Sequence, residues 1–257
     1  MIKDLVSIIT PTYNSDTYIS ETIDSVINQT YKYWEMIIID DNSSDNTGII
    51  VKKYTEKYNN IRYILLQRNQ GPAIARNIGI ESAKGQYIAF LDSDDLWKPN
   101  KLKEQINFMK EHNCALSFSQ YEEIDSEGNK LNILIKTPKY KISYHDYLVT
   151  TPIGCLTAMY DTEKLGKIYL PLLRNREDTA LWLKILKKGI YAYPIQKNLA
   201  YYRIHSNSIT SNKLKLFKYQ WDLYFNIEKL GYIKSIFYIF SITIVKILKL
   251  KEKRIDA

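Results

Sequence analysis

The sequence of 257 residues is poor in the side chains that bind transition metals or form disulfides. It contains two cysteines, Cys114 and Cys155, and three histidines. The cysteines form no Cys-x-x-Cys pair and are too few for a disulfide framework, which excludes a structural zinc site and a disulfide-stabilised secreted domain. We expect both cysteines to be buried as small apolar residues in a reducing compartment.

Glycine is also scarce, with nine residues in the chain. No Gly-x-Gly-x-x-Gly follows the first apolar run, and no Gly-x-x-x-x-Gly-Lys-[Ser/Thr] occurs anywhere. These absences disfavour a dinucleotide-binding fold and a P-loop. A phosphorylated ligand would therefore need a metal ion and polar side chains to neutralise its charge.

The C-terminal segment 213–257 lacks an apolar stretch long enough to cross a membrane. Its uncharged stretch 235–245 has 11 residues, whereas a spanning helix needs about 20. The segment carries ten basic and four acidic residues, which accounts for +6 of the net charge of +8. Because large apolar residues alternate with the basic ones, an anionic membrane surface is favoured over nucleic acid as a partner. Helices that pack on the body or form a homo-oligomer are the alternative.

The N-terminal residues 1–10 contain an apolar run that is too short, and interrupted too early, for a signal peptide. We therefore expect a cytoplasmic protein, with the basic segment at the inner face of the cell membrane.

The first hundred residues alternate between buried-strand and amphipathic-helix patterns. Strands are predicted at 5–10, 34–39, 61–66 and 86–91, and helices at 15–30, 47–58 and 72–84. This order predicts an α/β fold with a parallel sheet and helices on both faces. The pattern is weaker further on, where we predict helices at 102–112 and 177–188 and a strand at 114–121.

Polar clusters follow three of the four predicted strands, at Thr10–Asn14, Asp40–Asp45 and Asp92–Asp95. Each cluster alone is typical of a turn or a helix cap. Together they lie at the carboxyl edge of one sheet, where ligands bind in such folds. The side chains of Asp92 and Asp94 point to the same side of the chain, and an all-oxygen site of this kind suits Mg²⁺ or Mn²⁺ held together with substrate phosphates.

Four segments in order carry a family resemblance: Thr10-Pro-Thr-Tyr-Asn14, Ile37-Ile-Ile-Asp-Asp-Asn-Ser-Ser-Asp45, Gly71-Pro-Ala-Ile-Ala-Arg-Asn-Ile-Gly79 and Phe90-Leu-Asp-Ser-Asp-Asp95. They resemble the successive motifs of family 2 glycosyltransferases, which are inverting enzymes with the GT-A fold. The resemblance extends in weaker form to about residue 210. It implies a mixed sheet flanked by helices, with a C-terminal helical extension.

The resemblance also assigns roles to residues. Thr10, Pro11 and Tyr13 would lie against the nucleotide base, and Asp41 would hydrogen-bond the uracil edge. Arg76 would approach the nucleotide and its phosphates, and Ser93 would also bind the nucleotide. Asp92 would lie nearer the ribose, and Asp94 would bind the metal ion, Mn²⁺ or Mg²⁺. The competing interpretations are a helix cap for Asp41 and an ion pair with a helix carboxylate for Arg76.

Inversion requires a base that takes the proton of the attacking hydroxyl. Glu177-Asp178 opens the helix that ends near residue 188 and resembles the Glu-Asp motif of the family, whose Asp is the base. We assign this role to Asp178; ordinary capping by an acid at a helix start is the alternative. His205 resembles a further metal or diphosphate ligand, and Glu177 and Arg203 are candidate contacts to the diphosphate or the acceptor.

The resemblance implies transfer from a UDP-sugar to a saccharide acceptor, free or lipid-linked, in the synthesis of capsule, lipopolysaccharide or exopolysaccharide. Residues 1–110 would bind the nucleotide sugar, 111–212 the acceptor within the same domain, and 213–257 would form basic amphipathic helices. A sugar nucleotidyltransferase and a non-catalytic, membrane-associated nucleotide-binding module are the alternatives.

Overall fold

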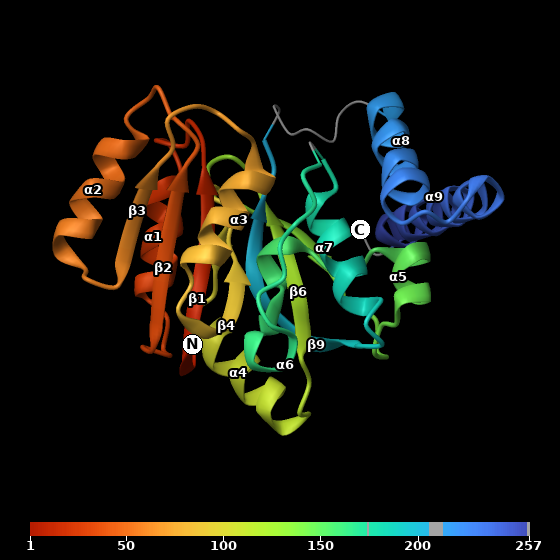
Figure 1. The fold of residues 1–257 in the computed structure, drawn as a ribbon, viewed down its shortest axis with the longest axis horizontal. Coiled ribbons are helices and arrows are strands. Elements are labelled where there is room, and N and C mark those ends of the chain that lie inside the picture. The colour runs from red at the N-terminus through yellow and green to blue at the C-terminus, as the bar shows by residue number, and fades with distance from the viewer. Residues whose placement is uncertain (174, 206–212, 256–257) are drawn as a thin grey trace.

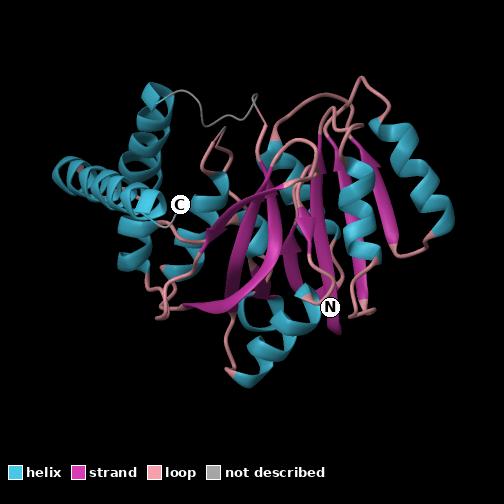
Figure 2. Ribbon diagram, turned by 180° about the vertical axis from the view of Figure 1, so that it is seen from behind, coloured by secondary structure: helices cyan, strands magenta, loops and turns pink. Residues whose placement is uncertain are grey.

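The computed structural model describes residues 1–173, 175–205 and 213–255. Within these ranges, only the backbone is described for residues 213–216 and 246–255. A nine-stranded sheet lies between helices on both faces (Figures 1 and 2). The strands are β1 (Ile2–Thr12), β2 (Trp34–Asp40), β3 (Ile61–Leu65), β4 (Gly85–Phe90), β5 (Leu96–Trp97), β6 (Leu116–Ile124), β7 (Lys130–Ile135), β8 (Met159–Asp161) and β9 (Ala192–Arg203). Their order in the sheet is β3-β2-β1-β4-β8-β6-β9-β5, with β7 paired to β6.

The strands β1 to β4 form the parallel sheet that the sequence predicts. β1 pairs with β2 from Val6 opposite Trp34 to Thr12 opposite Asp40, and with β4 as far as Ile9 opposite Phe90. Every residue of β2 and β4 is buried, which explains their continuous apolar pattern. Pro11 does not end β1 as expected. Beyond Ile9 the strand has only β2 as a neighbour, so the missing N–H of proline disrupts no second ladder.

Two hydrophobic cores lie on opposite faces of the sheet, because alternate residues of each strand point in opposite directions. Val6 and Ile8 belong to one core, and Ile9 belongs to the other. The first core is covered by the helices α1 (Ile19–Ile27), α2 (Thr47–Lys57) and α4 (Lys101–Glu111). The second is covered by α3 (Pro72–Ser82), α5 (Tyr144–Thr150), α7 (Glu177–Leu186) and α9 (Tyr232–Ile255).

The strands β4 to β9 make the sheet mixed. β8 runs antiparallel to both β4 and β6, whereas β9 runs parallel to β6 with register shifts near Gln120. The sequence pattern predicted β6 and α7 in outline, although β6 extends to Ile124. It missed β5, β7, β8, β9, α5 and the short helix α6 (Thr162–Leu165). β9 contains Pro194 and the polar Lys197 and Asn198, which interrupt the alternation of apolar and polar residues.

The C-terminal extension is helical, as expected. It consists of α8 (Lys213–Asp222), a π-helical turn at Leu223–Ile227, and α9. These helices lie beside α5, at the end of the molecule opposite α2 (Figure 1). Tyr224 attaches them to the body, since its buried hydroxyl donates a 2.6 Å hydrogen bond to the carbonyl of Leu148 in α5. Among the described helices, none has the length and apolar character needed to cross a membrane.

Candidate functional site

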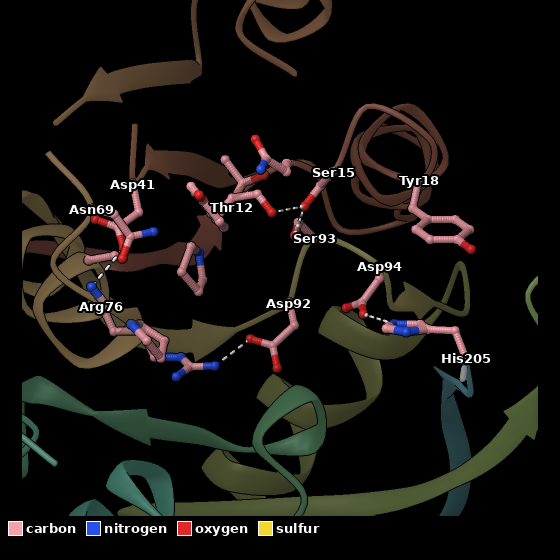
Figure 3. A pocket seen from close by; sticks show the side chains of 16 residues that line it. Thr12, Ser15, Tyr18, Asp41, Asn69, Arg76, Asp92, Ser93, Asp94 and His205 are labelled. Atoms are coloured by element: carbon pink, nitrogen blue, oxygen red, sulfur yellow. Dashed lines mark hydrogen bonds and ion pairs between the residues drawn. The ribbon is translucent and has the colours of Figure 1, made fainter. Parts of the chain in front are cut away.

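A cleft of about 410 Å³ opens at the carboxyl ends of β1, β2 and β4 (Figure 3). It is lined by Pro11, Thr12, Tyr13, Asn14, Ser15, Tyr18, Asp41, Asn69, Gly71, Pro72, Ala75, Arg76, Asp92, Ser93, Asp94 and His205. Segments that are up to 194 residues apart in the sequence, from Pro11 to His205, thus meet in one cavity. Eight of the twelve residues assigned from the sequence line this cleft; Thr10, Glu177, Asp178 and Arg203 do not.

The first strand contributes the wall on which a nucleotide base was expected. Pro11 and Tyr13 line the cleft there, but Thr10 is fully buried in the sheet and does not. Thr12, two residues further along the same face of β1, lines the cleft in its place. The assignment of Thr10 to the base-binding wall therefore moves to Thr12, which lies at the open end of the strand.

Asp41 holds the loop that leads into α3. Its two carboxylate oxygens accept hydrogen bonds from the backbone N–H groups of Gln70 and Gly71, at 2.8 and 2.7 Å. Gly71 has a φ of +90°, a conformation that other residues rarely adopt, and it immediately precedes α3. Asp41 thus fixes one wall of the cleft, whatever it contacts in a ligand.

The buried guanidinium of Arg76 lies between two carboxylates. Its Nη2 donates a 2.6 Å hydrogen bond to Asp92 Oδ1 at the cleft (Figure 3). Its Nη1 donates a 2.7 Å hydrogen bond to Glu177 Oε1 at the start of α7. Burial opposes the charge of Arg76, yet Asp92 and Glu177 raise its pKa well above the ordinary value. Burial also raises the pKa of Glu177, against the effect of Arg76. Arg76 is therefore an ion-pair residue as well as a cleft residue.

Asp94 faces His205 across the cleft, with Oδ2 and Nε2 2.8 Å apart (Figure 3). Burial, and then the charge of Asp92, raises the pKa of Asp94, and His205 partly opposes this. Asp92 and Asp94 therefore repel each other when both are charged, and a cation bound between these carboxylates and a ligand would offset the repulsion. In the described part of the chain no group of three His, Cys, Asp or Glu side chains is arranged to hold a metal. The donor set fits a Mg²⁺ or Mn²⁺ ion that takes Asp94 and His205 from the protein and its other ligands from a diphosphate and water.

Arg203 is a structural residue rather than the diphosphate or acceptor contact that the sequence suggested. Its side chain is fully buried. It donates to the carbonyl of Asp94 at 2.9 Å, to the carbonyl of Ser126 at 3.1 Å and to the carboxylate of Glu21 at 2.7 Å. Its backbone N–H donates to Asp95 Oδ1. These bonds saturate the guanidinium and fix the turn that presents Asp94.

Asp178 lies at the start of α7, beside Glu177. Its Oδ1 accepts a 2.7 Å hydrogen bond from the backbone N–H of Thr179, and within the described chain its Oδ2 accepts none. The preceding Arg176 has a φ of +65°, an uncommon value for a residue with a side chain and one that is found at functional sites. Among the described residues, the half-exposed carboxylate thus has one oxygen that accepts no hydrogen bond.

The sequence reasoning missed Ser15 and Tyr18. The hydroxyls of Ser15 and Ser93 lie 2.8 Å apart and join the first loop to the Asp92–Asp95 turn (Figure 3). The ring of Tyr18 stacks on His205 at 5.9 Å and also lies 4.7 Å from the guanidinium carbon of Arg203. Ser15 directly follows the first polar cluster, so the sequence could have indicated that it lies at the cleft. Nothing in the sequence pairs Tyr18 with residue 205.

Comparison with known proteins decides the family. The model for "Glycosyl transferase family 2" matches residues 7–169. The chain belongs to glycosyl transferase family 2. It is therefore a glycosyltransferase, and neither the nucleotidyltransferase nor the non-catalytic alternative is supported. As a member of family 2, it is similar to the putative teichuronic acid biosynthesis glycosyltransferase TuaG of Bacillus subtilis, with 46% identity over 233 residues that cover 91% of this chain and 92% of the relative.

Two further comparisons concern another relative and the fold. The Escherichia coli enzyme WfgD, named UDP-Glc:alpha-D-GlcNAc-diphosphoundecaprenol beta-1,3-glucosyltransferase, is 40% identical over 220 residues, 85% of each chain. S. aureus TarS, solved with UDP-GlcNAc, has the same fold with a TM-score of 0.68 at 24% identity; the match covers 85% of this chain and 65% of that one. Mannosyltransferase PcManGT from Pyrobaculum calidifontis, solved with GDP-Man and Mn²⁺, gives a TM-score of 0.67 at 18% identity and covers 88% of this chain and 65% of that one. The predicted GT-A fold is confirmed.

Proposed function

We propose that this glycosyltransferase moves a sugar, with inversion, from a UDP-sugar to a saccharide carried on a lipid diphosphate, in the synthesis of a bacterial surface polysaccharide. The observation that carries the proposal is the cleft in which Asp92, Asp94, Arg76 and His205 converge at the carboxyl ends of the strands. Two relatives support the setting: TuaG is named for teichuronic acid biosynthesis, and WfgD is named for a diphosphoundecaprenol acceptor.

The donor would lie with its base against Pro11, Thr12 and Tyr13 and its diphosphate beside Asp92 and Asp94. Mg²⁺ or Mn²⁺, held by Asp94 and His205, would supply positive charge to the diphosphate as the bond to the sugar breaks. Tyr18 orients the ring of His205 by stacking, and Arg203 fixes the backbone of Asp94. We place the reaction at the inner face of the membrane because the proposed acceptor is a lipid.

The transfer is a direct displacement at the anomeric carbon. The acceptor hydroxyl oxygen forms the new bond to this carbon, its proton passes to the free oxygen of Asp178, and the bond to the diphosphate breaks to release UDP. Arg76 holds Glu177, the neighbour of Asp178, so the position of the base is tied to that of Asp92. Inversion of an α-linked donor gives a β-linked product.

Thermal unfolding with UDP, GDP, CDP and ADP, each with and without Mn²⁺, tests the donor site. A ligand at about 100 times its dissociation constant adds roughly 2.7 kcal/mol of stability. We expect a shift with UDP that requires Mn²⁺ and disappears in Asp94→Ala. Asp24→Ala, an exposed carboxylate of α1 outside the cleft, is the matched control and should keep the shift.

A shift with GDP in place of UDP would contradict the UDP donor. A UDP shift that survives without metal and in Asp94→Ala would contradict the metal site. The stereochemistry has its own test: transfer from UDP-glucose to a GlcNAc-diphospholipid, followed by measurement of the anomeric coupling constant of the product. An α-linked product would contradict inversion.

A further inference from the structure

The long C-terminal helix α9 carries a row of large apolar side chains that face away from the protein. Its members, called here the α9 stripe, are Ile233, Ile236, Phe237, Phe240 and Ile244. Their spacing of three and four residues places them on one side of a helix. Ile233, Phe237 and Phe240 are 83%, 60% and 66% exposed.

The opposite side of α9 fixes the helix to the body. Ser235, Ile239 and Ile242 are buried on this side, and α9 packs chiefly against α5. The rings of Tyr232 and Tyr238 contact Trp221 and Tyr224, which precede α9 in the chain. The α9 stripe is therefore held in place rather than available to fold inward. Figures 1 and 2 show α9 extending beyond the sheet at the end of the molecule formed by α5 and α8.

The sequence around the α9 stripe carries mainly positive charge. Segment 229–255 contains seven basic residues and one acidic residue, Glu252. Lys234 lies within the length of the stripe, and the others precede it or follow it directly. A surface with aromatic and aliphatic side chains between lysines matches lipid chains below anionic headgroups.

We infer that the α9 stripe is a docking surface for an anionic lipid bilayer, on which α9 lies flat with its apolar side chains below the headgroups. A second copy of the chain fits this surface less well. A parallel pair of stripes would bring the basic ends of both helices together, with one carboxylate in each segment to offset them. In an antiparallel pair, the basic end of each helix would meet an end of the other that carries no acidic residue.

The docking of α9 on a bilayer is inferred from the helix itself. Only its purpose, which is to bring the enzyme to a lipid-linked acceptor, rests on the proposed function. α9 packs on α5, and Tyr147 of α5 lies close enough to Asp178 that the aspartate contributes to the raised pKa of the tyrosine. The helix α5 thus contacts both α9 and α7, the helix that begins with Glu177 and Asp178. Docking through α9 would hold the acceptor-side helices of the enzyme near a lipid-linked saccharide.

Flotation with lipid vesicles tests the inference. The full-length protein is mixed with vesicles of phosphatidylcholine alone, or of phosphatidylcholine with phosphatidylglycerol, at low and high salt. We expect binding to the phosphatidylglycerol vesicles, weaker binding at high salt, and little binding to phosphatidylcholine alone. The triple variant Ile233→Gln/Phe237→Gln/Phe240→Gln should bind about 100-fold more weakly, because three large apolar side chains no longer enter the bilayer.

A matched control removes three exposed apolar side chains from the other end of the molecule. Tyr33→Gln/Ile49→Gln/Leu65→Gln changes residues that precede β2 or lie in α2 and β3. This variant should bind the vesicles as the wild type does. Wild-type binding by the α9 triple variant, or equal loss in both variants, would overturn the inference.

Two further measurements distinguish a lipid surface from a second copy of the chain and from a fault in the proposed donor site. A wild type that is dimeric by light scattering, becomes monomeric in the α9 triple variant and binds no vesicles would overturn the inference in favour of a second copy. The UDP-dependent thermal shift is measured on both triple variants. Lost vesicle binding with a retained UDP shift supports the docking surface, whereas a missing UDP shift in a wild type that binds vesicles contradicts only the proposed donor.

Discussion

Arg76 and Glu177 are 101 residues apart in the sequence, yet Nη1 of the arginine donates a 2.7 Å hydrogen bond to Oε1 of the glutamate. The same guanidinium binds Asp92 in the cleft. One buried side chain therefore connects the donor-binding turn to the helix that begins at Glu177 and presents Asp178. The relative position of the two parts of the site depends on this connection.

Replacing Arg76 with methionine should destabilise the fold strongly. Glu177 would remain buried without its cation, and breaking a buried ion pair from one side costs about 3–5 kcal/mol. Urea unfolding measures the loss. Lys110→Met is the control, because Lys110 forms a 2.7 Å pair with Asp4 at the surface, where such pairs contribute about 1 kcal/mol or less. Equal losses of unfolding free energy in the two variants would contradict the prediction that the buried ion pair of Arg76 stabilises the fold more than a surface pair does.

Asp178→Asn should reduce turnover while leaving donor binding intact. A positioned base contributes about 10²–10⁴-fold to the rate, and Asp178 is not among the residues that line the donor cleft. UDP release in the presence of acceptor gives the rate, and the thermal shift with UDP and Mn²⁺ gives binding. Glu104→Gln, an acid in the first turn of α4, is the control and should retain full activity. Wild-type turnover by Asp178→Asn would exclude Asp178 as the base.

Arg203→Met should lower stability by about 3–5 kcal/mol, since the carbonyls of Asp94 and Ser126 lose their buried donor. The comparison is Glu21→Gln, which removes the charge on the other side of the ion pair. Glu21 is 53% exposed on its side chain, and glutamine keeps an oxygen that can accept from Arg203, so this variant should lose less stability than Arg203→Met. A stable Arg203→Met variant that lost only UDP binding would instead restore the ligand-contact role for this arginine.

The buried side chain of Lys101 predicts how the stability of the fold depends on pH. Its ammonium is fully buried, has no hydrogen-bond partner within the described chain, and lies 3.6 Å from the centroid of the Trp97 ring. Burial lowers the pKa of Lys101 well below its ordinary value. The unfolded chain then binds more protons than the folded chain, so stability rises with pH toward the unfolded pKa of about 10.4.

Lys101→Met should therefore stabilise the protein by about 1–3 kcal/mol near neutral pH, because it removes a buried amine that has no hydrogen-bond partner in the described chain and whose protonation favours the unfolded state. The gain should shrink as the pH approaches about 10, where the unfolded lysine also becomes neutral. Urea unfolding across this range measures the effect. Lys103→Met, at an exposed position of the same helix, should change stability little at any pH. A gain that did not depend on pH would contradict the lowered pKa.

The parallel part of the fold was predictable because its strands are buried on both faces. β2 and β4 are wholly buried and mainly apolar, and the polar clusters lie at the carboxyl ends of β1, β2 and β4. Asp92 and Asp94 could therefore be placed in the site from local pattern alone. The sequence analysis placed Thr10 at the cleft, whereas the residue of β1 that lines it is Thr12, two positions further on. Whether a residue of β1 lies inside the sheet or in the cleft depends on where β4 stops pairing, which the sequence does not show.

The roles of Arg203 and Tyr18 were not predictable from local pattern. Arg203 is satisfied by backbone carbonyls and by Glu21, which is 182 residues away. Any residue has a carbonyl, so the sequence carries no signal for such partners. The strands of the second half were missed for a related reason, since β9 keeps its place through pairing with β6 rather than through alternating side chains.

The order in which the chain is synthesised bears on when the site forms. Strands β1, β2 and β3 are neighbours in sequence and in the sheet, and each parallel pair is joined by one helical crossover, which contains α1 or α2. The contacts that complete the site span 101 residues from Arg76 to Glu177 and 111 from Asp94 to His205. A nascent chain can therefore pair β1, β2 and β3 before residue 205 is synthesised, whereas the contacts of Glu177 and His205 with the cleft form later.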